Sequence, residues 1–151
     1  MPEGVFLLVW GKVKMKLFIC CSKWFYDKIP EIKEKLEELG HIVTLPNSYE
    51  EPMKEEEIKK SGNLEKHIKF KRLMFKQQIK KIEDNDGILI LNFNKNQQMN
   101  YIGGATFLEM YDGWRYNKYL FLYNNIPNNI LRDEIIGLNP RLINKDLTKI
   151  K

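Results

Sequence analysis

Short, continuously apolar runs separated by longer segments of helical periodicity dominate the pattern of this chain. The clearest runs are Gly87–Leu91 and Tyr119–Tyr123, which are only strand-length and contain no regular polar alternation. Such runs are typical of interior strands in a parallel sheet that is covered on both faces. The segment Ile102–Tyr116 between them is therefore expected to be the helix that crosses over from one strand to the next.

The same pattern predicts further elements before and after this unit. Strands are expected at 16–21, 41–45 and 141–143. A helix is expected at 27–39, where Pro30 fits the first turn and Gly40 marks the end, and a short one at 129–136 with Gly137 as its stop.

The middle of the chain is expected to hold a flap and a long helix. The segment 48–63 is charged and contains proline, which suits a mobile segment over the carboxyl edge of the sheet better than a core element. The segment 64–85 is predicted to be an amphipathic helix laid on the sheet. Its apolar face consists of Leu64, Ile68, Phe75, Ile79 and Ile82.

Strands alternating with helices favour an α/β domain. We predict a three-layer, flavodoxin-like (Rossmann-like) fold with right-handed crossovers and a mainly parallel sheet of about five strands. With 151 residues, 43% of them hydrophobic, the chain is long enough for one well-cored domain, which we assign to 16–151. Residues 1–15 contain the apolar run Phe6–Trp10, which is an extra edge strand, a surface that packs on a partner, or part of an extension before a start at Met15.

Composition and charge indicate which cellular compartment and which classes of partner to expect. The net charge of +5 comes from lysines spread among many acids, so no nucleic-acid polymer is expected as a partner, whereas phosphorylated small molecules remain compatible. The adjacent Cys20 and Cys21 cannot form a disulfide framework, which favours a reducing compartment. No apolar run approaches the roughly 20 residues of a membrane span, and Val5–Trp10 lacks the flanks of a signal peptide. We therefore expect a soluble, cytoplasmic protein without a membrane partner.

Four loops are expected to meet at one edge of the sheet, because the carboxyl ends of parallel strands lie together there. They are the polar-aromatic loop 22–26, the segment after Pro46, the loop 92–100 and the turn Gly103–Gly104. The two glycines leave backbone N–H groups unobstructed at the start of a helix, which suits an anionic or strongly polar ligand. Glu109 follows within that helix between apolar neighbours, so its carboxylate either points into the cleft or reaches for water.

Structural roles compete with functional ones at the other candidate residues. The aromatic residues 24–26 offer a stacking face to a planar base, but aromatic side chains after a strand more often belong to the core. His41 and His67 have no cysteine or acid pair at metal-ligand spacing, so no metal site is expected. The lysines between 66 and 81 are expected to form a solvated helix face.

Three segments together resemble the nucleoside 2-deoxyribosyltransferase-like superfamily, including its short uncharacterised branch. They are KLFICCSKWFYD at the first strand, NDGILILN at the third, and NYIGGATFLEMYDGWRYNKYLFLYN after it, and the similarity extends from about Lys16 to Ile150. The resemblance implies a flavodoxin-like sheet, a homo-oligomer, and an enzyme of nucleotide metabolism that transfers or hydrolyses N-glycosidic bonds without a cofactor. Glu109 would be its catalytic nucleophile, attacking the anomeric carbon of a (deoxy)ribose.

The resemblance also implies a set of residues that bind a small-molecule nucleoside or nucleotide. They are Ser22, Trp24, Phe25, Tyr26, Asn92, Asn100, Tyr101, Gly103 and Gly104. One departure bears on the chemistry: family enzymes carry an acid on the preceding helix, and this chain has Gln78 at that position. An amide cannot replace a carboxylate in charge or proton transfer. Two alternatives therefore stay open, namely a nucleotide-binding or sensing module without turnover, and a structural interaction protein that uses Phe6–Trp10.

Overall fold

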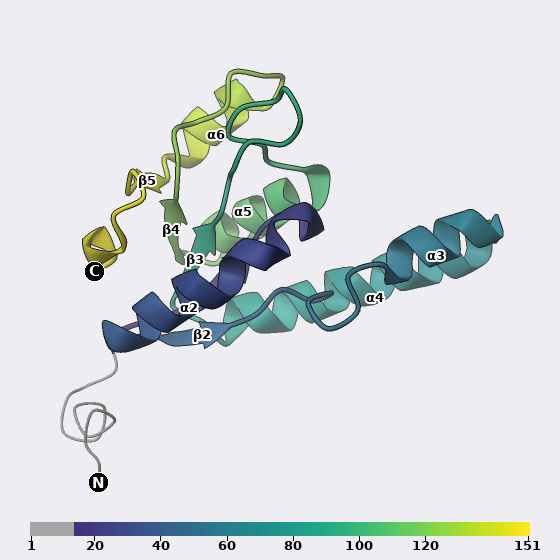
Figure 1. Cartoon of the computed structure of the whole chain (residues 1–151), viewed down its shortest axis with the longest axis horizontal. Helices are drawn as coiled ribbons and strands as arrows, with labels where there is room; N and C mark the ends of the chain where they lie inside the picture. Colours follow the sequence, from purple (N-terminus) through teal and green to yellow (C-terminus); the bar gives the residue numbers. More distant parts are fainter. Residues whose placement is uncertain (1–13) are drawn as a thin grey trace, which may run out of the picture.

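The computed structural model describes residues 14–151, and its middle layer is a five-stranded sheet with the order β2-β1-β3-β4-β5 (Figure 1). The strands are β1 (Lys16–Cys20), β2 (Ile42–Thr44), β3 (Gly87–Ile90), β4 (Tyr119–Leu122) and β5 (Arg141–Leu142). All four neighbouring pairs run parallel. This topology confirms the predicted α/β, flavodoxin-like fold. The three interpretations of the apolar run at 6–10 lie outside the described residues.

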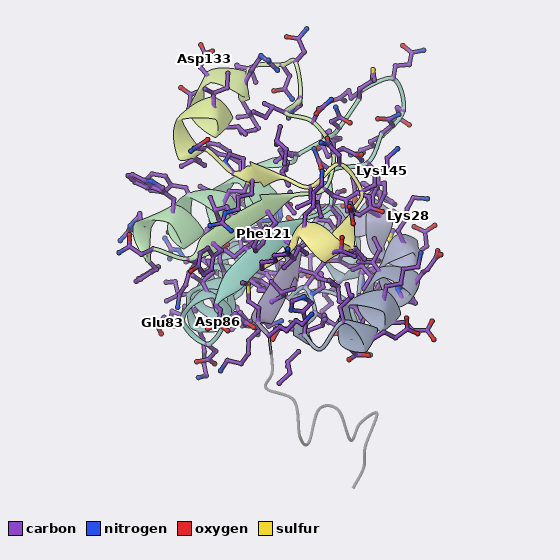
Figure 2. The ribbon with its side chains drawn as sticks, turned by 90° about the vertical axis from the view of Figure 1, so that its left-hand side faces the viewer. Lys28, Glu83, Asp86, Phe121, Asp133 and Lys145 are labelled. Carbon is purple, nitrogen blue, oxygen red and sulfur yellow. The ribbon has the colours of Figure 1, made fainter. Side chains whose placement is uncertain are left out.

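Helices cover both faces of the sheet, because successive strand residues point to opposite sides. Leu17 and Ile19 of β1 lie in the core beneath α2 (Ile29–Glu38), whereas Phe18 and Cys20 lie in the core on the opposite face. That opposite core is closed by α4 (Leu64–Glu83), α5 (Gly104–Arg115) and α6 (Arg132–Leu138). In Figure 2, Phe121 of β4 lies inside the molecule, while charged side chains such as Glu83 and Asp133 lie at its periphery.

The segment predicted to be a mobile flap contains a helix. Residues Lys54–Ser61 form α3, which packs on α4 after Gly62 turns the chain at φ 72°. Asn63 then caps α4 by accepting a hydrogen bond from the Lys66 backbone N–H. Figure 1 shows that α3 and the first half of α4 project beyond the sheet.

This projection overturns the prediction that the apolar face of 64–85 lies on the sheet. Only Ile82, at the end of α4 nearest the strands, is fully buried. The exposed members of that face are Leu64, Ile68, Phe75 and Ile79. A helix of 20 residues is longer than these short strands, so its first turns have no sheet beneath them.

Two predicted boundaries also need correction. The predicted loop 22–26 belongs to a 3₁₀ helix, η1 (Lys23–Lys28), so α2 begins at Ile29 instead of residue 27. Gly137 lies within α6, and Asn139, at φ 51°, ends that helix. Within the described chain, no helix is both long and apolar enough to cross a membrane.

Candidate active site

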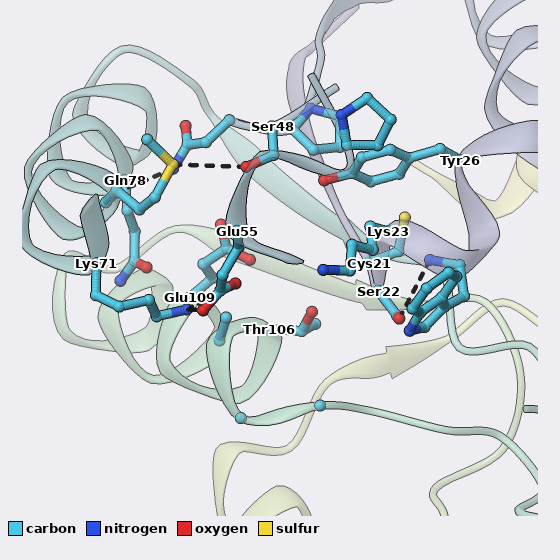
Figure 3. Close-up of a pocket in the computed structure, with 18 of the residues that line it drawn as sticks. Cys21, Ser22, Lys23, Tyr26, Ser48, Glu55, Lys71, Gln78, Thr106 and Glu109 are labelled. Carbon is cyan, nitrogen blue, oxygen red and sulfur yellow. Dashed lines mark hydrogen bonds and ion pairs between the residues drawn. The ribbon is translucent and has the colours of Figure 1, made fainter. Parts of the chain in front are cut away.

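A cleft of about 230 Å³ lies at the carboxyl edge of the sheet, over the ends of β1, β2 and β3. One wall follows β1 and contains Cys21, Ser22 and the start of η1, and the other follows β3 and contains the first turns of α5. The chain leaves neighbouring strands β1 and β3 toward opposite faces of the sheet, as expected at the topological switch point where α/β proteins bind ligands. The flap residues and α4 close the cleft on its outer side (Figure 3).

Glu109 lines this cleft although its side chain is almost completely buried, with 8% exposed. Burial raises the pKa of Glu109 to about 7, while a hydrogen bond from the Cys20 thiol and the charges of Lys81 and Lys71 lower it and the charge of Asp112 raises it. Within residues 14–151 the Glu109 carboxylate has no salt-bridge partner within 4.0 Å. A buried, unpaired carboxylate of this kind is poised to change its protonation state near neutral pH.

Gln78 lies on the wall that α4 contributes and is buried. Its Nε2 donates a hydrogen bond to Oδ2 of Asp112 over 2.7 Å, across the α4–α5 interface. Asp112 stands one helical turn after Glu109 on α5. Gln78 therefore holds the carboxylate nearest to Glu109 along the helix instead of acting as an acid itself.

Two consecutive acids of the flap bridge the rims of the cleft. Glu56 pairs with Lys23 of η1 on one side. Glu55 lines the cleft and contacts α4 on the other side, with Oε2 placed 2.7 Å from Nε2 of His67 and 3.3 Å from Nζ of Lys71. These contacts hold the first turn of α3 over the mouth of the cleft. Figure 3 shows Glu55, Lys71 and Glu109 on the same side of the pocket.

Aromatic rings and lysines form the rim nearest to η1. Trp24 is half exposed, and the ammonium groups of Lys23 and Lys95 lie 5.4 Å and 5.9 Å from its ring centroid. The Lys95 ammonium also lies 4.5 Å from the ring of Tyr101. A planar base that stacks on Trp24, or an anionic group near these lysines, would be favoured at this rim.

The cleft also has open space beside Gly104 and a buried hydrogen-bond acceptor without a partner among the described residues. A Cβ added to Gly104 would meet nothing within 4 Å, so the start of α5 is open on that side. Asn47 donates from Nδ2 to the backbone carbonyl of Met74, but its buried Oδ1 has no hydrogen-bond partner among the described residues. Because buried acceptors are normally satisfied, this oxygen is suited to a donor group on a ligand.

The structure brings most of the predicted site residues together. Those that line the cleft are Ser22, Trp24, Tyr26, Tyr101, Gly103, Gly104 and Glu109. Three others do not line it. Phe25 is buried in the core against Phe93 and Tyr101, because consecutive residues of η1 point in different directions.

The two asparagines proposed to bind substrate have local structural roles. Asn92 is completely buried, and its amide bonds the backbone of Asn124 and Asn125, joining the loops after β3 and β4. Asn100 has a φ of 54° and donates its backbone N–H to Asn94 Oδ1, so it shapes the turn before α5. The expected placement of both in the cleft is therefore corrected.

The predicted site omits two residues that line the cleft, Glu55 and Lys71, and a lysine beside it, Lys81. Glu55 and Lys71 were assigned to a flap and to a solvated helix face, because only the packing of α3 on α4 brings them to the cleft. Lys81 belonged to the same predicted solvated face, yet it is half-buried, donates to the Leu45 carbonyl at 2.8 Å and places its charge near Glu109. The only sequence signal for the position of Lys81 is that it directly precedes Ile82, the one fully buried residue of the predicted apolar face.

Among residues 14–151, no group of three or more histidine, cysteine, aspartate or glutamate side chains is arranged to hold a metal ion. Cys20 and Cys21 are both free and buried, and they point to opposite faces of the sheet.

No family model matches the chain, and no curated protein matches it at a significant level. The resemblance described above therefore depends on the quoted motifs alone.

Proposed function

We propose that this protein is an N-glycosidic-bond enzyme acting on a nucleoside or nucleotide, with Glu109 as the nucleophile. The observation that carries the proposal is the placement of one buried, unpaired carboxylate in the wall of the cleft at the switch point of the sheet. A deoxyribosyltransferase or N-glycosidase needs such a carboxylate below the sugar ring. The substrate is a cytoplasmic small molecule, not a nucleic-acid polymer.

The reaction takes place in two displacements. The ionised Glu109 carboxylate attacks the anomeric carbon, the C–N bond breaks with its electron pair going to the base, and a glycosyl ester forms on Glu109. The departing base takes up a proton from solvent. Water or a second base then attacks the same carbon, and the C–O bond to Glu109 breaks, which regenerates the carboxylate. Water gives hydrolysis, and a second base gives transfer.

The remaining wall residues suit the parts of such a substrate. Trp24 offers an exposed indole face for the base, and Asn47 offers its unsatisfied Oδ1 to a donor on the base or sugar. The open side of Gly104 leaves room for the sugar close to the start of α5. Lys23 and Lys95 supply positive charge if the substrate carries a phosphate.

The test is chromatography of free base after incubation with a panel of nucleosides and nucleotides, each with and without a second base. Wild-type protein is expected to release base from at least one of them. Glu109→Gln is expected to release none while keeping its fold, which circular dichroism checks. Equal release by the wild type and by Glu109→Gln would rule out the proposed mechanism.

A second candidate function is a nucleotide-binding or sensing module without turnover. The observation that favours it is Gln78, whose amide is engaged with Asp112 and cannot transfer a proton. Isothermal titration calorimetry separates the two candidates: heat of binding for a nucleotide, with no free base after long incubation, is the result expected of the module.

We also propose that the protein forms a homo-oligomer through α4 and α5. Support comes from large apolar side chains exposed on the two helices, which pack against each other: Ile68, Phe75, Ile79, Leu108 and Tyr111. A second copy of the chain would bury them. Light scattering is expected to show that Ile79→Glu is a smaller species than the wild type. Leu73→Glu is the matched control, because Leu73 is also exposed but lies about 120° around α4 from Ile79. An unchanged mass for Ile79→Glu would contradict this interface.

A further inference from the structure

A second carboxylate lines the cleft from the flap. Glu55 lies in the first turn of α3, and within the described chain it and Glu109 are the two acidic residues that line the cleft. They reach it from different elements, since Glu109 belongs to α5. Two carboxylates from separate elements around one substrate site are the usual equipment for breaking a glycosidic bond.

Lys71 connects the two carboxylates electrostatically. Its Nζ lies 3.3 Å from Glu55 Oε2, and its positive charge also lowers the pKa of Glu109. The Glu55 side chain is 25% exposed, so it reaches both the cleft and solvent. Its position is fixed from two directions on α4, by Lys71 and by His67.

The surroundings of Glu55 and Glu109 shift the pKa values of the two carboxyl groups in opposite directions. Burial alone would raise the pKa of Glu55, but hydrogen bonds from His67 and Lys71 and the charges of Lys71 and Lys23 hold that pKa below its usual value. Burial dominates at Glu109, whose pKa is about 7. Two carboxyl groups whose environments shift their pKa values in opposite directions differ in protonation near neutral pH. Glu55 is the member that stays ionised at neutral pH.

Gln78 leaves the site in need of such a group. The second displacement removes a proton from water or from an acceptor base, and an amide cannot accept it. Asp112 is bonded by Gln78 and is not part of the cleft wall. Glu55 is the remaining ionised carboxylate in that wall.

We propose that Glu55 is the general base of the second displacement, an inference that rests on the proposed function. The oxygen of water bonds to the anomeric carbon of the glycosyl ester while one water proton moves to the Glu55 carboxylate. The C–O bond to Glu109 breaks with its electron pair returning to Glu109. When a second base is the acceptor, its N–H proton passes to solvent, in the reverse of the step by which the departing base takes up a proton.

The proton then has a route out of the cleft. The Glu55 side chain is 25% exposed, so its carboxyl group can release the proton to solvent while Nε2 of His67 stays 2.7 Å from Oε2. Glu55 returns to its ionised form for the next cycle.

The test compares Glu55→Gln, Glu55→Asp and Glu57→Gln with the wild type by rapid quench and intact-protein mass spectrometry. Glu57 is the matched control, because it lies in the same turn of α3 but is exposed. Glu55→Gln is expected to release about one equivalent of base per site rapidly and then to turn over roughly 10²-fold or more slowly than the wild type. Its glycosyl ester should accumulate, and azide should restore turnover, because azide attacks without losing a proton. Glu55→Asp should retain part of the steady-state rate, and Glu57→Gln all of it.

Three other outcomes would contradict the role proposed for Glu55, and one of them would also contradict the proposed function. Steady-state turnover of Glu55→Gln at the wild-type rate would eliminate Glu55 as the general base and leave Glu109 as the nucleophile. Loss of the rapid burst together with the slow phase, in a variant with a wild-type thermal midpoint, would place Glu55 in substrate binding or in the first displacement instead. Failure of the wild type to release base from any substrate would remove both this inference and the proposed function.

Discussion

The side-chain amide of Gln78 donates to the carboxylate of Asp112 over 2.7 Å, joining α4 to α5 one helical turn from Glu109. The amide satisfies a partly buried acid without adding a second negative charge. Because position 78 holds an amide and not a carboxylate, Asp112 contributes the only negative charge of this contact, one helical turn from Glu109.

Introducing an acid at position 78 is expected to destabilise the protein. In Gln78→Glu the new carboxylate would face Asp112 across the helix interface, and we expect a loss of about 1–3 kcal/mol in the free energy of unfolding at pH 8. The double variant Gln78→Glu/Asp112→Asn should recover most of it, because the donor and acceptor are exchanged. Urea unfolding of the four proteins in a double-mutant cycle measures the coupling. Additive effects would contradict a direct interaction.

The proposed role of Glu109 as the nucleophile predicts how activity depends on pH. A nucleophilic carboxylate must be ionised, so kcat/KM for base release should rise as pH increases through about 7 and level off above it. Lys81→Met should move this limb to higher pH, because the charge of Lys81 lowers the pKa of Glu109. Rate profiles between pH 5 and pH 9 test both statements. A limb that stays in place in Lys81→Met would contradict the electrostatic assignment.

The same raised pKa affects stability in the opposite direction. Between the ordinary pKa of 4.5 and the folded value of about 7, the folded protein binds more protons at Glu109 than the unfolded chain does, so its stability falls as pH rises. Glu109→Gln lacks this titration. Relative to the wild type, it should gain at most about 3 kcal/mol between pH 4 and pH 8. Denaturant unfolding at both pH values measures the gain, and a stability difference that does not change with pH would contradict the burial of an ionisable Glu109.

Close packing of α5 on the sheet depends on Gly113. A Cβ at this position would lie 2.9 Å from Leu120 Cδ2 and would also collide with Ile88. We therefore expect Gly113→Ala to lower the free energy of unfolding by about 1–3 kcal/mol. Gly137→Ala in α6 is the control, because an added Cβ meets nothing within 4 Å there and alanine favours the helix by about 0.5–1 kcal/mol. Thermal midpoints shifted in the same direction would contradict this packing.

The sequence was sufficient for the sheet because the apolar runs are both short and continuous. Burial on both faces leaves few other structures for a run such as Gly87–Leu91, and the order of elements then places loops at the carboxyl edge. Glu109 could be placed in the cleft from the same logic, since the helix after β3 must start at that edge. For these residues, the local hydrophobic pattern and the order of elements along the chain predict the same position in the fold.

The residues that escaped prediction depend on packing between elements. Periodicity identifies the apolar stripe of α4, but it does not show that the first half of the helix extends past the sheet and leaves Leu64 and Ile68 exposed. Glu55 reaches the cleft only because α3 folds back on α4. Neighbouring residues of a tight 3₁₀ helix also diverge, so Trp24 lines the cleft whereas Phe25 is in the core.

The most direct test of the central claim is to locate the covalent intermediate. The wild-type protein is quenched in acid during turnover of a nucleoside that it cleaves, digested, and mapped by tandem mass spectrometry, with Glu109→Gln treated in parallel. The account predicts a sugar residue esterified to Glu109 in the wild type and no adduct and no free base with Glu109→Gln. Release of base by Glu109→Gln at the wild-type rate, or a sugar residue attached to a different side chain, would contradict it.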